Sequence, residues 1–131
     1  MTHFAEIEVV TLFVEDVEAA KRFYLDVLGS ELVFGDETSA VVKLSNLMIN
    51  LLRTDNAPTL VEPMQVAGHA TGARALYTIR VENADAAYEE LTRRGAHFLN
   101  GPVDRSWGRR TAAFADPAGN VWEIAEELPE S

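Results

Sequence analysis

Residues 11–20 have the sequence Thr-Leu-Phe-Val-Glu-Asp-Val-Glu-Ala-Ala, and residues 78–87 have the related sequence Thr-Ile-Arg-Val-Glu-Asn-Ala-Asp-Ala-Ala. Five of these ten positions are identical, and most of the others are mild exchanges such as Asp16 for Asn83. A glycine follows each copy at nearly the same distance. A repeat offset by about half of the 131 residues indicates two similar modules, which we expect to share a single domain over residues 1–131.

Each copy predicts a strand followed by a helix. The first copy continues an apolar, β-branched stretch over residues 7–14, which is typical of a buried strand. Asp16 is a favourable N-cap, the apolar residues after it keep helical spacing, and Gly29 is expected to end the helix. By the same reasoning, the second copy predicts a strand and then a helix that Asn83 caps and Gly95 ends.

Three short strands are predicted after each helix, because short β-prone runs alternate there with turn residues. Gly101-Pro102 is expected to break the first of these strands in the second module. Each module therefore has the order β-α-β-β-β. The predicted strands after the helices are residues 31–34, 40–44 and 47–52 in module one, and residues 97–99, 110–115 and 121–125 in module two.

The modules have definite limits in the sequence. Module one is expected at residues 7–53 and module two at residues 75–126. Residues 54–74 contain two prolines, two glycines and no clear period, so they are predicted to form a linker loop. Such a linker would let the modules pair within one chain or exchange between two chains.

The charge balance excludes several classes of partner. The chain has 11 basic and 21 acidic residues, a formal net charge of −10, which disfavours nucleic acid and anionic membrane as partners. No apolar run approaches the roughly 18 residues of a membrane-spanning helix. The N-terminal residues lack the pattern of a signal peptide, and cysteine is absent. We therefore expect a cytoplasmic protein.

Two sequence motifs, together with the repeat, suggest a family. Residues 14–29 have the sequence Val-Glu-Asp-Val-Glu-Ala-Ala-Lys-Arg-Phe-Tyr-Leu-Asp-Val-Leu-Gly. Residues 107–111 are Trp-Gly-Arg-Arg-Thr, and residues 114–124 are Phe-Ala-Asp-Pro-Ala-Gly-Asn-Val-Trp-Glu-Ile. Over nearly its whole length, the chain resembles the vicinal oxygen chelate superfamily, which includes glyoxalase I, extradiol dioxygenases and bleomycin-resistance proteins.

The resemblance implies an α+β fold in which two βαβββ modules form a cupped eight-stranded sheet around a cavity, with the helices outside. It also implies a homodimer, because many small relatives build two cavities from both chains; whether the modules are swapped stays open. Catalytic relatives hold a divalent metal between the first and last strands of both modules, typically with two histidines or glutamines and two glutamates.

The resemblance places the four metal-ligand positions at Val9, near Asn50, at Leu76 and at Glu123. Val9 and Leu76 have no donor atom, and an amide such as Asn50 is a poor substitute for a carboxylate. The histidines lie elsewhere in the predicted fold, at His3, His69 and His97. We therefore expect no metal and no other cofactor.

Successive side chains of a strand point to opposite faces of its sheet. Because the metal-ligand positions of the family face the cavity, every second residue counted from them is predicted to face it as well. Trp107 is either a plug at the sheet edge or a stacking platform for a ligand. One of Arg109 and Arg110 is expected to be solvated and the other ion-paired. The predicted ligand-binding residues are Thr11, Phe13, Phe34, Met48, Asn50, Leu76, Thr78, Trp107, Arg109 and Glu123.

The leading functional hypothesis is a metal-free binding protein. By resemblance to the bleomycin-resistance proteins, it would sequester a toxic natural product, either apolar and aromatic or cationic, and no residue would be catalytic. The alternative is a metal-dependent lyase, isomerase or dioxygenase with an irregular metal site. A third hypothesis is a metal-free enzyme that uses Glu123 as a base.

Overall fold

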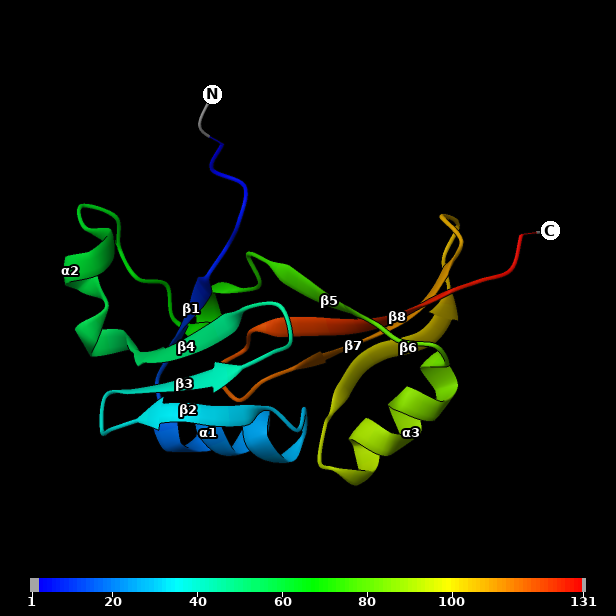
Figure 1. Cartoon of the computed structure of the whole chain (residues 1–131), viewed down its shortest axis with the longest axis horizontal. Coiled ribbons are helices and arrows are strands. Elements are labelled where there is room, and N and C mark those ends of the chain that lie inside the picture. Colours follow the sequence, from blue (N-terminus) through cyan, green and yellow to red (C-terminus); the bar gives the residue numbers. More distant parts are fainter. Residues whose placement is uncertain (1–2, 131) are drawn as a thin grey trace.

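Each half of the chain forms a four-stranded sheet with a helix packed against one face (Figure 1). The computed structural model describes residues 3–130. The first half contains β1 (Val9–Val14), α1 (Val17–Asp26), β2 (Glu31–Gly35), β3 (Ser39–Lys43) and β4 (Met48–Arg53), and the second contains β5 (Leu76–Arg80), α3 (Ala84–Arg93), β6 (Phe98–Asp104), β7 (Arg109–Ala115) and β8 (Val121–Glu127).

The two sheets have the same topology. Their strand orders are β1-β4-β3-β2 and β5-β8-β7-β6. In each sheet the first and last strands of the module are parallel neighbours, and the other pairs are antiparallel. The repeated sequence therefore forms a repeated structure, and the predicted α+β fold of two βαβββ modules with cupped sheets is confirmed.

The repeated residues have the predicted local roles. The side chain of Asp16 accepts a hydrogen bond from the backbone N–H of Ala19 at 3.0 Å, and Asn83 accepts one from Ala86 at 3.0 Å. These bonds satisfy amide groups that the first turn of a helix otherwise leaves without a partner. Both α1 and α3 therefore begin as the sequence predicts.

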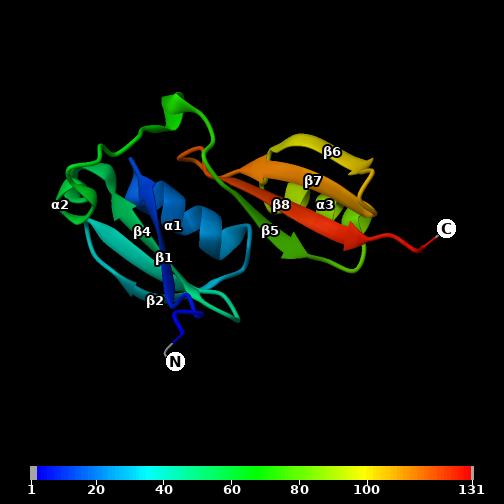
Figure 2. The same ribbon diagram turned by 90° about the horizontal axis from the view of Figure 1, so that it is seen from above.

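The hydrophobic core lies between the sheets and the helices. Both α1 and α3 cover the same side of the molecule, which can be followed in two perpendicular views (Figures 1 and 2). Alternate strand residues such as Leu12, Val14 and Ile124 are buried against the helices. Among the described residues, no helix packs on the opposite face of either sheet (Figures 1 and 2), and we call these two surfaces the helix-free faces.

A buried hydrogen-bond network joins the two halves. The hydroxyl of Tyr24 on α1 donates to Asp116 Oδ2 at 2.6 Å, and Trp122 Nε1 on β8 donates to the same hydroxyl at 3.0 Å. Asp116 lies in the turn between β7 and β8 and is itself buried. The helix of module one is therefore bonded to the last hairpin of module two.

Two segments differ from the sequence prediction. β6 continues through Gly101-Pro102, because β6 is an edge strand, where proline is tolerated, and its register shifts against β7. Residues 54–74 are not a plain loop, since they contain the short helices η1 (Thr54–Asn56), α2 (Pro58–Val61) and η2 (His69–Thr71). Over residues 3–130, no helix is long and apolar enough to cross a membrane.

Candidate functional site

The helix-free faces carry two equivalent polar pairs. Strand register places Thr11 of β1 beside Asn50 of β4, and Thr78 of β5 beside Glu123 of β8. Asn50 Nδ2 donates to Thr11 Oγ1 at 3.5 Å, whereas Thr78 Oγ1 donates to Glu123 Oε1 at 2.9 Å. Each module thus presents one polar pair, and the pair of module two carries the negative charge.

Hydrocarbon side chains flank both polar pairs. Two residues earlier on the same faces, Val9 lies beside Met48 and Leu76 lies beside Val121. The side chains of Val9 and Leu76 are 37% and 51% exposed in the single chain. The helix-free faces therefore combine an apolar floor with few hydrogen-bonding groups, which is the usual lining of a small-molecule site.

The donor set does not fit the divalent metal that the fold family implies. In the described part of the chain, no three His, Cys, Asp or Glu side chains come together. Val9 and Leu76 have no donor atoms, and Glu123 Oε1 already accepts a hydrogen bond from Thr78. Divalent metals in catalytic sites bind imidazole nitrogen or carboxylate oxygen, so these residues supply one suitable ligand.

The predicted binding residues do not share one cavity within a single chain. Thr11 and Phe13 line a cavity of about 320 Å³ under residues 65–75, which we call the linker cavity. Leu76 and Thr78 line a separate depression between β5 and the β3–β4 turn, and Met48 lines a third. Asn50 and Glu123 line none of these three depressions, and their roles as ligand contacts stay predictions.

The remaining predicted residues lie on an outer strand, in a turn and at the start of a strand. Phe34 is on β2, the outermost strand of its sheet, and is exposed. Trp107 lies in the turn between β6 and β7 and is 70% exposed, so it is not a buried plug in the single chain. Of the two arginines, Arg110 is the ion-paired one, with Asp85 and Asp104 as partners, and Arg109 begins β7.

The linker cavity was not predicted from the sequence. Besides Thr11 and Phe13, it is lined by Arg74, Tyr77 and Asn120. One signal was available, because residues 63–81 contain no Asp or Glu in a chain with 21 acidic residues.

Comparison with known proteins agrees with the fold. Residues 4–124 match the family described as the Glyoxalase/Bleomycin resistance protein/Dioxygenase superfamily. The chain belongs to this superfamily. The resemblance seen in the sequence is confirmed at this level, whereas the metal-free bleomycin-resistance branch is not established by the match.

Individual relatives in the superfamily add little about activity. The uncharacterised protein YraH of Bacillus subtilis is 30% identical over 124 residues, which cover 91% of this chain and 96% of YraH. A glyoxalase/bleomycin resistance protein/dioxygenase from Nocardioides has a TM-score of 0.87 at 24% identity, covering 100% of this chain and 89% of that one. Lactoylglutathione lyase from Agrobacterium tumefaciens has a TM-score of 0.74 at 19% identity, covering 93% of each chain. At these identities, the solved structures show the fold alone.

Proposed function

We propose that this member of the superfamily binds a small molecule without a metal and sequesters it, and that the ligand is a toxic natural product with an apolar or aromatic body and a cationic group. The observation that carries the proposal is the pair of hydrocarbon side chains, Val9 and Leu76, at positions where catalytic relatives need metal donors.

The pair formed by Thr78 and Glu123 is the reason for proposing a cationic group on the ligand. Glu123 Oε1 accepts from Thr78, and no partner is recorded among residues 3–130 for Oε2, which is left for a donor on the ligand. A charge-assisted hydrogen bond to a carboxylate is stronger than one between neutral groups. The net charge of −10 also attracts cations to the protein surface.

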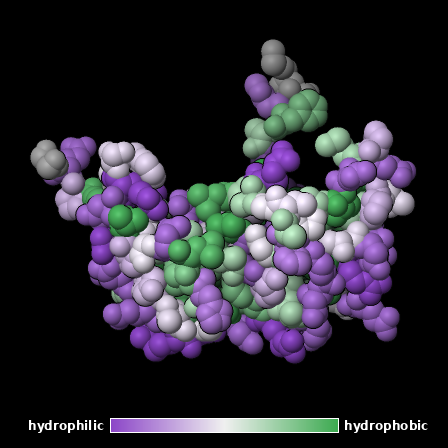
Figure 3. Space-filling view, turned by 180° about the vertical axis from the view of Figure 1, so that it is seen from behind, coloured by the Kyte–Doolittle hydropathy of each residue, from purple (hydrophilic) through white to green (hydrophobic). Residues whose placement is uncertain are grey.

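The proposed functional unit is a homodimer. Both helix-free faces point to the same side of one chain and are open there (Figures 1 and 2). Apolar side chains also gather where the two halves meet on the side seen from behind (Figure 3), and β1 and β5 are edge strands of the sheets that form the helix-free faces. A second copy would cover these faces and enclose the polar pairs.

The test is a titration with bleomycin, mitomycin C and an enediyne antibiotic, followed by the fluorescence of Trp107 and Trp122. We expect at least one of these compounds to bind more tightly than about millimolar. Glu123→Gln should weaken the binding of a cationic ligand by about tenfold, because the substitution removes the negative charge of the side chain and keeps its shape. Glu89→Gln is the matched control, since Glu89 is exposed on α3.

Failure of all three compounds to bind, or equal weakening by both variants, would contradict the proposal. A metal-dependent lyase, isomerase or dioxygenase predicts a different result. Protein purified without chelator would then contain stoichiometric Ni, Zn, Mn or Fe, whereas our proposal predicts less than about a tenth of an equivalent by elemental analysis.

A further inference from the structure

The linker cavity lies at the junction of the two modules, away from Glu123. Its walls come from β1, from residues 65–75 of the linker, from the start of β5, and from the turn that leads into β8. Its volume of about 320 Å³ is at the lower end of the range for small-molecule sites. The volume is equivalent to roughly ten water molecules, which suits a compact ligand.

The charge of the linker cavity is opposite to that of the protein as a whole. None of the described residues that line it is Asp or Glu, although the chain has 21 acidic residues. Arg74 lines it and is exposed, and in the described part of the chain Arg74 has no recorded ion pair or hydrogen bond. By contrast, Arg53, Arg80 and Arg110 each have an acidic partner.

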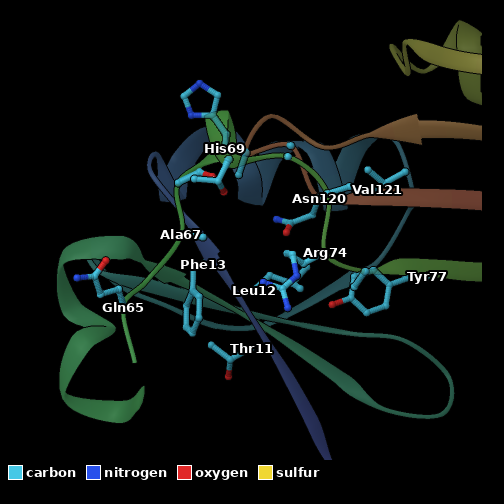
Figure 4. A pocket seen from close by; sticks show the side chains of 17 residues that line it. Thr11, Leu12, Phe13, Gln65, Ala67, His69, Arg74, Tyr77, Asn120 and Val121 are labelled. Atoms are coloured by element: carbon cyan, nitrogen blue, oxygen red, sulfur yellow. The ribbon is translucent and has the colours of Figure 1, made fainter. Parts of the chain in front are cut away.

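Two polar groups face the same region as Arg74. In the close view, the guanidinium of Arg74 lies near the centre, and the hydroxyl of Tyr77 and the amide of Asn120 point toward it (Figure 4). Burial, and then the negative charge of Asp116, raise the pKa of Tyr77, so its hydroxyl stays a hydrogen-bond donor. Asn120 Nδ2 donates to Asp116 Oδ2 at 3.0 Å, which holds the amide in place.

The rest of the wall is apolar. The ring of Phe13 stands across the cavity from Tyr77, and Leu12 and Val121 contribute further hydrocarbon surface (Figure 4). A flat apolar group can contact the ring of Phe13, and aromatic contacts add to the energy of area burial. A ligand with an anionic group beside Arg74 and an apolar body beside Phe13 would therefore match both the charged and the apolar parts of the cavity.

The linker segment over the cavity is tied to module one. The backbone N–H of His69 donates to Glu15 Oε2 at 3.2 Å, and the His69 ring lies 3.3 Å from the same oxygen. Burial alone would raise the pKa of Glu15, but these hydrogen bonds outweigh it and the pKa lies below its usual value. The ring of His69 points away from Arg74 (Figure 4), so Arg74 supplies the positive charge that faces inward.

We propose that the linker cavity is a binding site for a small monocarboxylate with a flat apolar body, held by Arg74 and oriented by Tyr77. A guanidinium binds a carboxylate through two parallel hydrogen bonds. A phosphate fits less well, because phosphate sites usually surround the dianion with several backbone N–H groups or more than one basic side chain. The site shares Thr11, Phe13 and Val121 with the helix-free faces, but Glu123, which carries the charge in the proposed function, does not line it.

The experiment is a titration of ¹⁵N-labelled protein by NMR with sodium benzoate, benzamide and inorganic phosphate. Benzoate should give saturable shifts in residues 65–75 and 118–121, with a dissociation constant of about a millimolar or tighter. Benzamide, which has the same shape and no charge, should bind at least about tenfold more weakly. Arg74→Gln should weaken the binding of benzoate by about tenfold or more.

Arg22→Gln is the matched control, because Arg22 is exposed on α1, carries the same charge and does not line the cavity. It should leave benzoate binding unchanged, and so should Glu123→Gln, which separates this site from the cation contact proposed at Glu123. Absence of saturable shifts up to about 20 mM benzoate would overturn the proposal. Equal binding of benzamide, equal or tighter binding of phosphate, or unchanged binding by Arg74→Gln would overturn it as well.

Discussion

At the scale of single residues, the hydroxyl of Tyr24 links the two halves of the chain. It donates to Asp116 and accepts from Trp122 inside the core, where Tyr24 is fully buried. Asp116 also accepts hydrogen bonds from the backbone of Ala118 and Asn120, so its charge is compensated without bulk water. Removing the hydroxyl would leave the Trp122 N–H without its partner and would cost more than a single exposed hydrogen bond.

Tyr24→Phe should therefore lower the free energy of unfolding by about 1–3 kcal/mol. Tyr88→Phe is the matched control, because Tyr88 is partly buried against Phe98 and its hydroxyl makes no hydrogen bond within residues 3–130. Urea unfolding at pH 7 measures both changes. Equal losses in the two variants would show that the network has no special role.

The same network has a pH dependence of known sign. Burial, and then the charge of Asp116, raise the pKa of Tyr24 above its ordinary value of 10.0. The contribution to stability is complete below pH 10 and is lost as the pH rises from 10 toward the folded-state pKa, because only the unfolded chain ionises there. The difference in stability between wild type and Tyr24→Phe should shrink over that alkaline range.

Some residue roles could be predicted from the sequence and others could not. Asp16 and Asn83 were predictable as helix caps, because capping depends on bonds within three residues. The hydrogen bond between Tyr24 and Asp116 was not, since it joins positions 92 residues apart that no local pattern connects. Arg74 was missed for the same reason, because the path of the linker is set by contacts such as Glu15 with His69.

At the scale of elements, β6 shows why a predicted break did not occur. Gly101 has a φ of 84°, which favours glycine, and a side chain there would place its Cβ in a clash with the carbonyl oxygen of Thr111 on β7. The backbones of β6 and β7 therefore approach each other closely at a register shift. Glycine lets the strand bend and continue, whereas the sequence alone indicated an end.

Gly101→Ala should destabilise the protein by about 2 kcal/mol or more, through both backbone strain and the clash with β7. Gly108→Ala is the matched control, because its φ of 86° is nearly the same and nothing lies within 4 Å of the added Cβ. It should show the smaller loss that comes from backbone strain alone. Thermal or urea unfolding of both variants measures the difference, and equal losses would exclude the clash as a cause.

At the scale of the whole molecule, the fold was predictable and the shape of the binding site was not. The repeat and the alternation of buried residues along β1 and β5 depend on local periodicity, and the structure has both. Which surfaces meet across the modules depends on long-range packing. Five of the predicted ligand residues therefore line three separate depressions in one chain, and the other five line none of these three.

The proposed homodimer explains why those faces are open. Leu76 is 51% exposed on β5, an edge strand, and apolar edges of this kind pair with another chain unless a charge protects them. Light scattering should give twice the 14.4 kDa mass of the chain at about 50 µM. Leu76→Lys should weaken the dimer by about tenfold or more, because it places an uncompensated charge in the covered face.

Leu60→Lys is the control, since Leu60 is 67% exposed on α2 in the linker and lies on neither helix-free face. Both leucines are exposed in the single chain, so neither substitution should unfold it. A monomeric wild type at about 50 µM would leave the polar pairs open to water, and a small ligand held at Glu123 would then be only partly covered. The enclosed site proposed for the helix-free faces therefore requires the dimer, and the mass measurement decides whether that site exists in solution.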